Sequence, residues 1–178
     1  MTFLYALQQT IDRFSQLSGR LLSVLSVVMM LSLSAVVVLR YGFNLGSIAM
    51  QELVTYLHAT VFMLGTAYTL QQDGHVRVDI FYRRFSPRAK AWVNSLGGLI
   101  FLLPLCGYFV LSSWEFVGQS WSIKEGSADP GGLPAVFLLK TLIPLMAISL
   151  ALQAVAEVLR NALLLITAGP ADKRAAGA

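Results

Sequence analysis

Four long runs of apolar residues divide the chain into candidate membrane spans. A helix needs about 20 apolar residues to cross the roughly 30 Å hydrocarbon core of a bilayer. The first three runs contain no Asp, Glu, Lys or Arg, and the fourth has Lys140 near its start and Glu157 near its end. Lys140 can reach an interface along its own aliphatic stem. The pattern therefore predicts four transmembrane helices, at about residues 21–39, 53–72, 91–114 and 135–158.

The first twenty residues follow a different pattern. Apolar residues recur at helical spacing between positions 3 and 17, and the other face carries Gln8, Gln9, Asp12, Arg13 and Gln16. Such alternation at a helical period is typical of an amphipathic helix. We therefore expect residues 1–20 to form an interfacial helix on the inner membrane surface, just before the first span.

A second interfacial segment is predicted between the second and third spans. Its apolar residues alternate with cations, which would bury the aromatics among acyl chains and place the cations near phosphates. Pro87 either breaks this segment or opens the next helix. The residues concerned are Ile80, Phe81 and Phe85, with Arg83, Arg84, Arg88 and Lys90.

The remaining segments connect or end the spans. Turn-forming residues at 129–134 predict a shaped hairpin between the last two helices. Residues 168–178 are small or polar and are expected to form a flexible tail. Residues 1–167 are therefore interpreted as a single four-helix membrane domain.

The distribution of cations predicts the orientation of the helices. Loops rich in Lys and Arg stay in the cytoplasm. Ten of the thirteen basic residues lie before the first span, between the second and third spans, or after the fourth. Only Arg40, Lys124 and Lys140 lie at the opposite side. Both termini are therefore expected in the cytoplasm.

Composition excludes several other classes of protein. The chain is 56% hydrophobic and only 12% charged, whereas soluble domains carry about 25% charged residues. Disorder requires low hydrophobicity and high charge, so it is excluded by the same values. A single cysteine, Cys106, excludes an intramolecular disulfide framework. The net charge of +4 accompanies apolar runs, which suits lipid headgroups better than nucleic acid.

No pattern in the sequence predicts an enzyme, a cofactor or a metal site. The chain has no phosphate-binding loop, no nucleophile elbow and no zinc-ligand spacing. The two histidines, His58 and His75, differ in membrane depth by most of a bilayer, which argues against a pair of haem ligands. Intramembrane carboxylates usually mark a transport path, and none is well placed here. The chain is therefore not expected to move a substrate by itself.

The candidate functional residues are polar groups at the membrane borders, and we expect structural or interface roles for them. Glu52 opens the second span, where a carboxylate also complements a helix dipole. The run from His75 through Arg77 to Asp79 is either a solvated loop or a fixed polar group that sets a helix turn or contacts a partner. The full set of candidates is Arg40, Glu52, His75, Arg77, Asp79, Lys140 and Gln153.

Two stripes of small residues predict close helix packing. Ala91, Ser95 and Gly98 form one on the third span, and Ala147, Ala151 and Ala154 form the other on the fourth. Such stripes let helix backbones approach closely in lipid. They either close the four-helix unit internally or receive the helices of a partner. The stripe beside Gln153 is expected to be the tightest contact with that partner.

Over about residues 20–160 the chain resembles the small membrane subunit of tripartite ATP-independent periplasmic (TRAP) transporters, the DctQ-like family. One departure is Ala49-Met50, where many relatives have a tryptophan. The motifs that carry the resemblance, in order, are Arg40-Tyr41, Gln51-Glu52-Leu53, Leu64-Gly65 with Ala67, His75-Val76-Arg77-Val78-Asp79, Trp121-Ser122-Ile123, Gly131-Gly132-Leu133-Pro134, Lys140 and Leu152-Gln153.

The resemblance implies a location in the bacterial inner membrane and a division of labour between three proteins. A large membrane subunit would carry substrate and sodium, a periplasmic binding protein would deliver the substrate, and the small subunit would brace the large one. The second half of the chain looks like a branch of the family associated with organic acids. Two other interpretations stay open, which are the membrane anchor of a redox enzyme and a small dimeric exporter.

Overall fold

A computed structural model describes residues 2–75 and 79–167 of the protein. Within these residues the regular secondary structure is helical throughout. The helices are α1 (Thr2–Gly42), α2 (Ile48–Gln71), α3 (Asp79–Tyr82), α4 (Pro87–Gly97), the π-helical turn η1 (Gly98–Leu102), α5 (Leu103–Ser122) and α6 (Val136–Thr167). Because α4, η1 and α5 follow one another directly, they act as one long helix of 36 residues. Four helices are therefore long and apolar enough to span a membrane, as the sequence predicts.

The apolar runs set the positions of the helices, and the helices extend beyond them. Each predicted span lies within one of the four long helices to within one residue at its ends. The predicted interfacial segment at 1–20 is helical, and it continues without a break into the first span as α1. Pro87 opens α4 and does not break a helix. The side chain of Ser86 caps the helix by accepting a hydrogen bond from the backbone N–H of Ala89. Pro87 is in the first turn, where a backbone N–H has no partner within the helix, so its missing N–H costs nothing.

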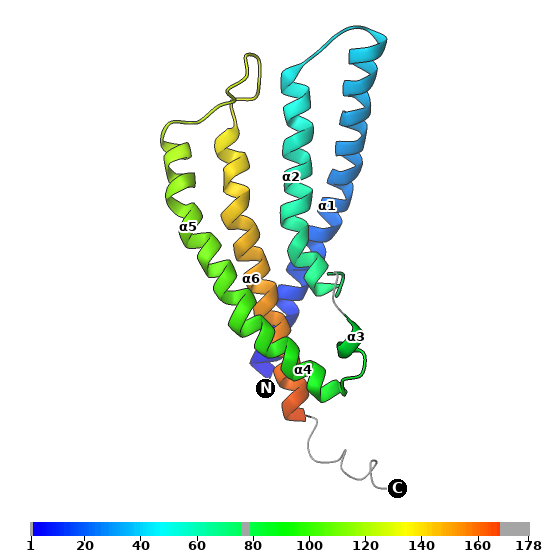
Figure 1. Ribbon diagram of the computed structural model, residues 1–178, viewed down its shortest axis with the longest axis vertical. Helices are drawn as coiled ribbons and strands as arrows, with labels where there is room; N and C mark the ends of the chain where they lie inside the picture. Colours follow the sequence, from blue (N-terminus) through cyan, green and yellow to red (C-terminus); the bar gives the residue numbers. More distant parts are fainter. Residues whose placement is uncertain (1, 76–78, 168–178) are drawn as a thin grey trace.

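The four long helices form two pairs that converge at one end. In Figure 1, α1 packs beside α2 and α5 beside α6, and the pairs approach each other toward the end where α1 begins and α6 ends. Helix α6 is central, because it packs against α1, α2, α4, η1 and α5. In agreement, 33% of its most apolar window is buried, against 6% in each of the other spans.

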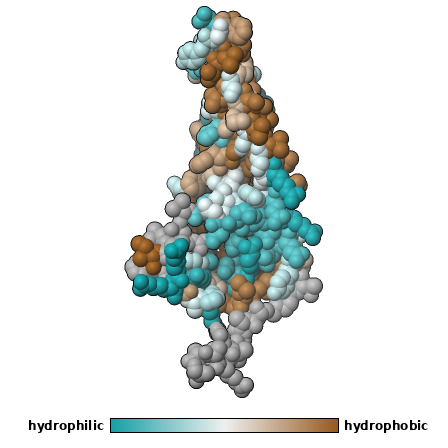
Figure 2. Space-filling model, turned by 90° about the vertical axis from the view of Figure 1, so that its right-hand side faces the viewer, coloured by the Kyte–Doolittle hydropathy of each residue, from teal (hydrophilic) through white to brown (hydrophobic). Residues whose placement is uncertain are grey.

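Most of the remaining apolar surface faces outward. Large exposed side chains follow α1 on its outer side, for example Leu21, Val24 and Leu31. Figure 2 shows an apolar upper part on the face formed by the right-hand side of Figure 1, and a hydrophilic lower part. This surface suits acyl chains or another membrane protein.

The small-residue stripes pack within the chain. Ala91 on α4 is 3% exposed, and Ala147 and Ala154 on α6 are each 1% exposed. A Cβ built on Gly98 would lie 2.9 Å from Cγ2 of Val158, so η1 and α6 approach too closely for a side chain there. The expectation that the α6 stripe receives a partner helix is therefore wrong for Ala147 and Ala154, because contacts within the chain already cover them. Ala151 is half-exposed and lines an apolar groove between α5 and α6.

The close approach at Gly98 predicts a position-specific cost of adding a side chain. Gly98→Leu should lower the free energy of unfolding by about 1–3 kcal/mol, because the new side chain overfills the contact with Val158. The matched control is Gly97→Leu, since a Cβ on Gly97 meets no atom within 4 Å. Thermal unfolding in detergent compares the two variants, and equal loss in both would show that η1 does not pack tightly on α6.

Candidate functional site

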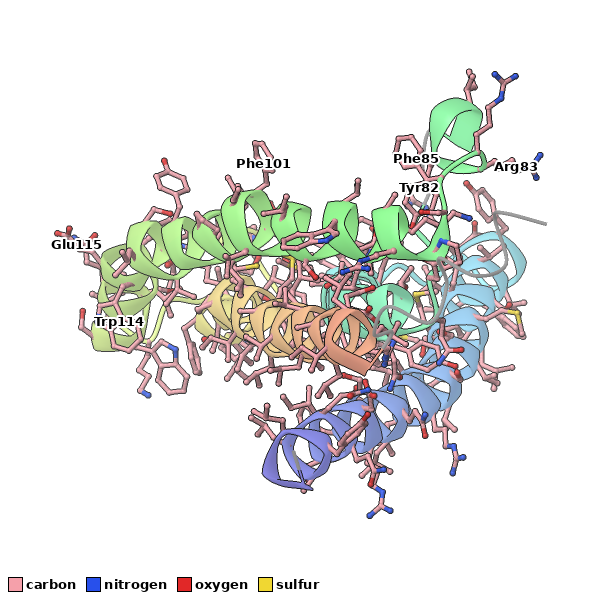
Figure 3. The ribbon with its side chains drawn as sticks, turned by 90° about the horizontal axis from the view of Figure 1, so that it is seen from below. Tyr82, Arg83, Phe85, Phe101, Trp114 and Glu115 are labelled. Carbon is pink, nitrogen blue, oxygen red and sulfur yellow. The ribbon has the colours of Figure 1, made fainter. Side chains whose placement is uncertain are left out.

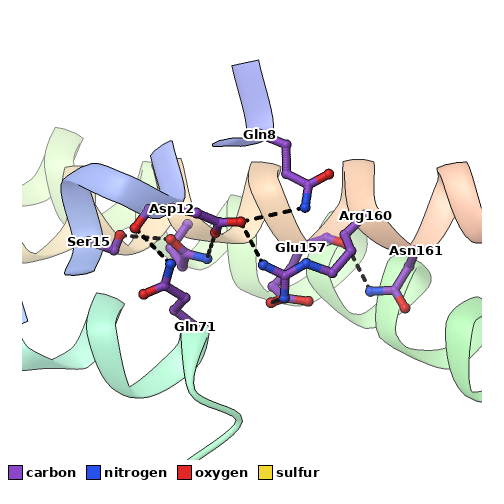
Figure 4. Close-up of polar contacts among 8 residues, drawn as sticks. Gln8, Asp12, Ser15, Gln71, Glu157, Arg160 and Asn161 are labelled. Atoms are coloured by element: carbon purple, nitrogen blue, oxygen red, sulfur yellow. Dashed lines mark hydrogen bonds and ion pairs between the residues drawn. The ribbon is translucent and has the colours of Figure 1, made fainter. Parts of the chain in front are cut away.

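The best-connected polar group in the structure surrounds Asp12 of α1. We call it the Asp12 cluster, and Figure 4 shows its contacts. It draws on three helices, and α6 contributes Gln153, Glu157 and Arg160 from positions that share one helical face. Its members are Asp12 and Ser15 of α1, Gln71 of α2, and Gln153, Glu157 and Arg160 of α6.

Each oxygen of the Asp12 carboxylate accepts from α6. Nε2 of Gln153 donates to Oδ1 over 3.0 Å, and a guanidinium nitrogen of Arg160 donates to Oδ2 over 2.8 Å. The same guanidinium also pairs with Glu157. The Asp12 side chain is 17% exposed and that of Arg160 is 35% exposed. A charge in such a setting is stabilised only when it is paired and hydrogen-bonded.

Gln153 is the most deeply buried member of the cluster. Its side chain is 0% exposed, and its Oε1 accepts a hydrogen bond of 2.7 Å from the Ser15 hydroxyl. Gln71 adds the third helix, because its Nε2 donates to the backbone oxygen of Asp12 over 2.7 Å. The cluster therefore joins α1, α2 and α6 at a single point.

The sequence around Asp12 shapes α1 for this contact. Ile11 and Ser15 are buried one turn apart, while Phe14 and Leu17 on the outer side are 58% and 59% exposed. A Cβ on Gly19 would overlap the ring of Tyr68, so α1 and α2 touch closely one turn further on. This stretch of α1 thus turns Ile11, Ser15 and Gly19 inward, whereas Phe14 and Leu17 face outward.

At the opposite end of the bundle, Glu52 holds the loop between α5 and α6. Its carboxylate accepts hydrogen bonds from the hydroxyl of Ser127 and, over 2.6 Å, from the backbone N–H of Leu133. Gly132 has to be a glycine here, because a Cβ would meet Ser127 and Glu52. Gly131 has a φ of +83°, which also favours glycine. The predicted hairpin at 129–134 is thus fastened to α2.

Lys140 closes the same loop from the side of α6. Its Nζ lies 2.5 Å from a carboxylate oxygen of Glu125 and 4.0 Å from the centre of the Phe116 ring. A second contact lies beside it, where Nε1 of Trp121 donates to the hydroxyl of Thr141 over 2.8 Å. These contacts join the end of α5, the loop and the start of α6.

Three of the sequence-predicted candidates have contacts that define their roles. Gln153 belongs to the Asp12 cluster, and Glu52 and Lys140 fasten the α5–α6 loop. Glu52 does not lie in the first turn of its helix, where it was expected to complement the helix dipole, because α2 begins at Ile48 after the capping residue Ser47. The carboxylate instead accepts hydrogen bonds from the α5–α6 loop, whose residues lie 75 or more positions further along the chain.

Of the other four candidates, the structure describes the side chains of Arg40 and His75. Arg40 is exposed near the end of α1, where it lines an open hollow with Gln51. His75 is exposed after α2. Arg77 lies outside the described residues, as does the side chain of Asp79, the first residue of α3. The expected polar group of His75, Arg77 and Asp79 therefore stays a prediction.

Sequence reasoning missed five members of the Asp12 cluster as site residues: Asp12, Ser15, Gln71, Glu157 and Arg160. It placed Asp12 on the polar face of a surface helix. The structure instead turns Asp12 toward α2 and α6, while Gln9, Arg13 and Gln16 of that face stay exposed. The sequence did contain one signal of this cluster, because Gln153, Glu157 and Arg160 are spaced to share one helical face. Polar side chains on a buried face require hydrogen-bond partners from elsewhere in the chain. Nothing local identifies those partners.

Comparison with known proteins identifies the family of the chain. The family model of the DctQ component of tripartite ATP-independent periplasmic transporters matches residues 29–164. The chain belongs to this family. It is therefore a small membrane component of a TRAP transporter and not an enzyme, and it is a multi-pass protein of the inner membrane.

A curated relative of this TRAP component is the putative TRAP transporter small permease protein of Haemophilus influenzae. The two are 28% identical over 95 residues, which cover 53% of this chain and 55% of the relative. The chain thus spans about half the length of the curated relative that it matches. No solved structure matches it. TRAP transporters in general combine such a subunit with a large membrane subunit and a periplasmic binding protein.

The burial of Gln153 predicts a large effect of removing its amide. Gln153→Leu keeps the volume similar but removes the donor to Oδ1 of Asp12 and the acceptor of the Ser15 hydroxyl. It should therefore cost about 1–3 kcal/mol of stability or more. Gln119→Leu on the exposed side of α5 is the control, because its one contact is with exposed Glu115. Chemical or thermal unfolding in detergent measures both variants, and an unchanged Gln153→Leu would contradict the role given to the Asp12 cluster.

The Glu125–Lys140 pair predicts a dependence of stability on pH. The hydrogen bond from Lys140 holds the pKa of the Glu125 carboxyl below its usual value of 4.5. A group whose pKa is lowered by folding stabilises the protein above its unfolded pKa, and this stabilisation is lost as the pH falls through the folded pKa.

We therefore expect Glu125→Gln to lower the melting temperature at pH 7, and the difference from the wild type to fade below about pH 4.5. Glu115→Gln serves as the control, because Glu115 is an exposed carboxylate on α5 whose contact is a neutral glutamine. A difference between wild type and Glu125→Gln that persists unchanged at about pH 3 would show that the charge of Glu125 does not fasten the loop.

Proposed function

We propose that this chain braces the large membrane subunit of its TRAP transporter during sodium-coupled uptake of an organic acid. A periplasmic binding protein delivers the acid, and the large subunit carries the acid and the sodium ions. The small subunit contributes a rigid, static surface against which a moving part of the transporter works. Both termini of the chain lie in the cytoplasm.

The observation that supports this proposal most is that the polar side chains of the bundle pair with one another within the chain. Asp12, Gln153 and Arg160 pair with one another between the helices, and Glu52 and Lys140 pair with a loop. Within the described residues, these groups form their hydrogen bonds and ion pairs inside the chain, at the two ends of the bundle. A transport path needs polar groups that face a cavity in mid-membrane, so this arrangement fits a support better than a carrier.

The outward apolar surface supports the same proposal. Large side chains along α1, such as Leu21, Val24 and Leu31, are more than half exposed. A rigid bundle with such a face can pack broadly against another membrane protein, where association depends on close packing and not on hydrophobicity alone. The orientation is supported by the cations at the end where α1 begins.

We expect uptake to require the subunit although it binds no substrate. Cells that contain the large subunit and the binding protein should lose uptake of the acid when this chain is deleted and regain it when the chain is restored. The affinity of the purified binding protein for the acid should be unchanged. Transport by this chain alone in liposomes, or micromolar binding of the acid to it, would contradict the proposal and favour a dimeric exporter.

A further inference from the structure

The segment from Ile80 to Trp92 forms a surface to which the proposed bracing role assigns no function. We call it the basic ledge. Its exposed cations are Arg83, Arg84 and Arg88. Ile80 is 72% exposed, Phe85 is 40% exposed and Trp92 is 53% exposed. Between Asp79 and Glu115 the sequence has no acidic residue, so nothing within the ledge neutralises these cations.

The ledge has a defined shape because α3 is pinned to α4. The Tyr82 hydroxyl donates to Oδ1 of Asn94 over 3.1 Å, and Nζ of Lys90 lies 5.2 Å from the centre of the Tyr82 ring. The rings of Tyr82 and Phe85 are 6.2 Å apart. Figure 3 shows Tyr82 and Phe85 on the side of α4, while Arg83 points away from the bundle. The contacts of Tyr82 with α4 therefore hold α3 in place, with Arg83 directed away from the bundle.

The length of the third span places the ledge at the depth of the lipid headgroups. The helix from Pro87 to Ser122 has 36 residues, which at 1.5 Å per residue is about 54 Å, whereas the hydrocarbon core is about 30 Å thick. Figure 1 shows α4 beyond the level at which α2 ends. Trp92 follows one turn inside the helix, and tryptophan is enriched where hydrocarbon meets headgroups.

We propose that the basic ledge binds anionic phospholipid, such as phosphatidylglycerol, through its headgroup phosphate. Arg83, Arg84 and Arg88 contact the phosphates, and the exposed side chains of Ile80, Phe85 and Trp92 lie among the adjoining acyl chains. An acidic protein partner would match the arginines alone, but it gives no reason for exposed apolar side chains at the membrane border. The observations therefore favour lipid over a soluble partner.

The test is lipid binding to the full-length chain in detergent micelles doped with phosphatidylglycerol or phosphatidylcholine. Native mass spectrometry counts the lipids retained as each is titrated. The wild type should retain phosphatidylglycerol in preference to phosphatidylcholine. Arg83→Gln/Arg84→Gln should weaken that binding about tenfold or more, because two of the three arginines that contact the headgroup phosphate are lost and each such contact contributes about fivefold. Raising the ionic strength should weaken wild-type binding too.

Arg13→Gln/Arg20→Gln is the matched control. It removes two exposed arginines from α1 at the same end of the bundle, and it should change the affinity for phosphatidylglycerol less than twofold. Equal loss in the two double variants, or equal retention of both lipids by the wild type, would overturn the proposal. So would a ledge variant that keeps its lipid affinity but loses a co-purifying protein. None of these results depends on whether the chain supports uptake.

Discussion

The carboxylate of Asp12 is the constraint on which the rest of the bundle depends. A charge between apolar helices is costly unless it is fully paired, and Asp12 finds its partners on α6, while its backbone oxygen accepts from α2. This fixes the height and rotation of α1 relative to both helices. It also explains why α6 is central, because α6 supplies Gln153 and Arg160 to α1 and small residues to α4.

The opposite end is held by a second, independent set of charges. Glu52 and Lys140 both act on the α5–α6 loop, one from α2 and one from α6. Between the two ends the helices touch through small residues such as Ala147, where dispersion and close approach decide the packing. A bundle fastened at both ends resists splaying of its two helix pairs, which is the mechanical property that a bracing subunit needs.

The sequence alone predicted the four spans and the turn-rich connection at 129–134. It also singled out Glu52, Lys140 and Gln153, which the structure places in contacts between separate elements. Charge-free runs and turn residues are local signals, so they can be read without a structure. The partners of those residues could not be predicted. Gln153 and its partner Asp12, for example, are separated by 141 positions, and any polar residue on a helix face fits such a role. The π-helical turn at Gly98–Leu102 was missed for a similar reason, since its packing against Val158 depends on tertiary contact.

The most direct test of this account is a double-mutant cycle between Asp12→Asn and Arg160→Gln in the full-length chain. Unfolding in detergent gives the free energies of the wild type, both single variants and the double variant. If the Asp12 cluster holds α1 to α6, the two changes should be coupled by about 0.5–3 kcal/mol, with the double variant less damaged than the sum of the singles. Additive effects, with no coupling, would contradict the claim that this contact sets the arrangement of the bundle.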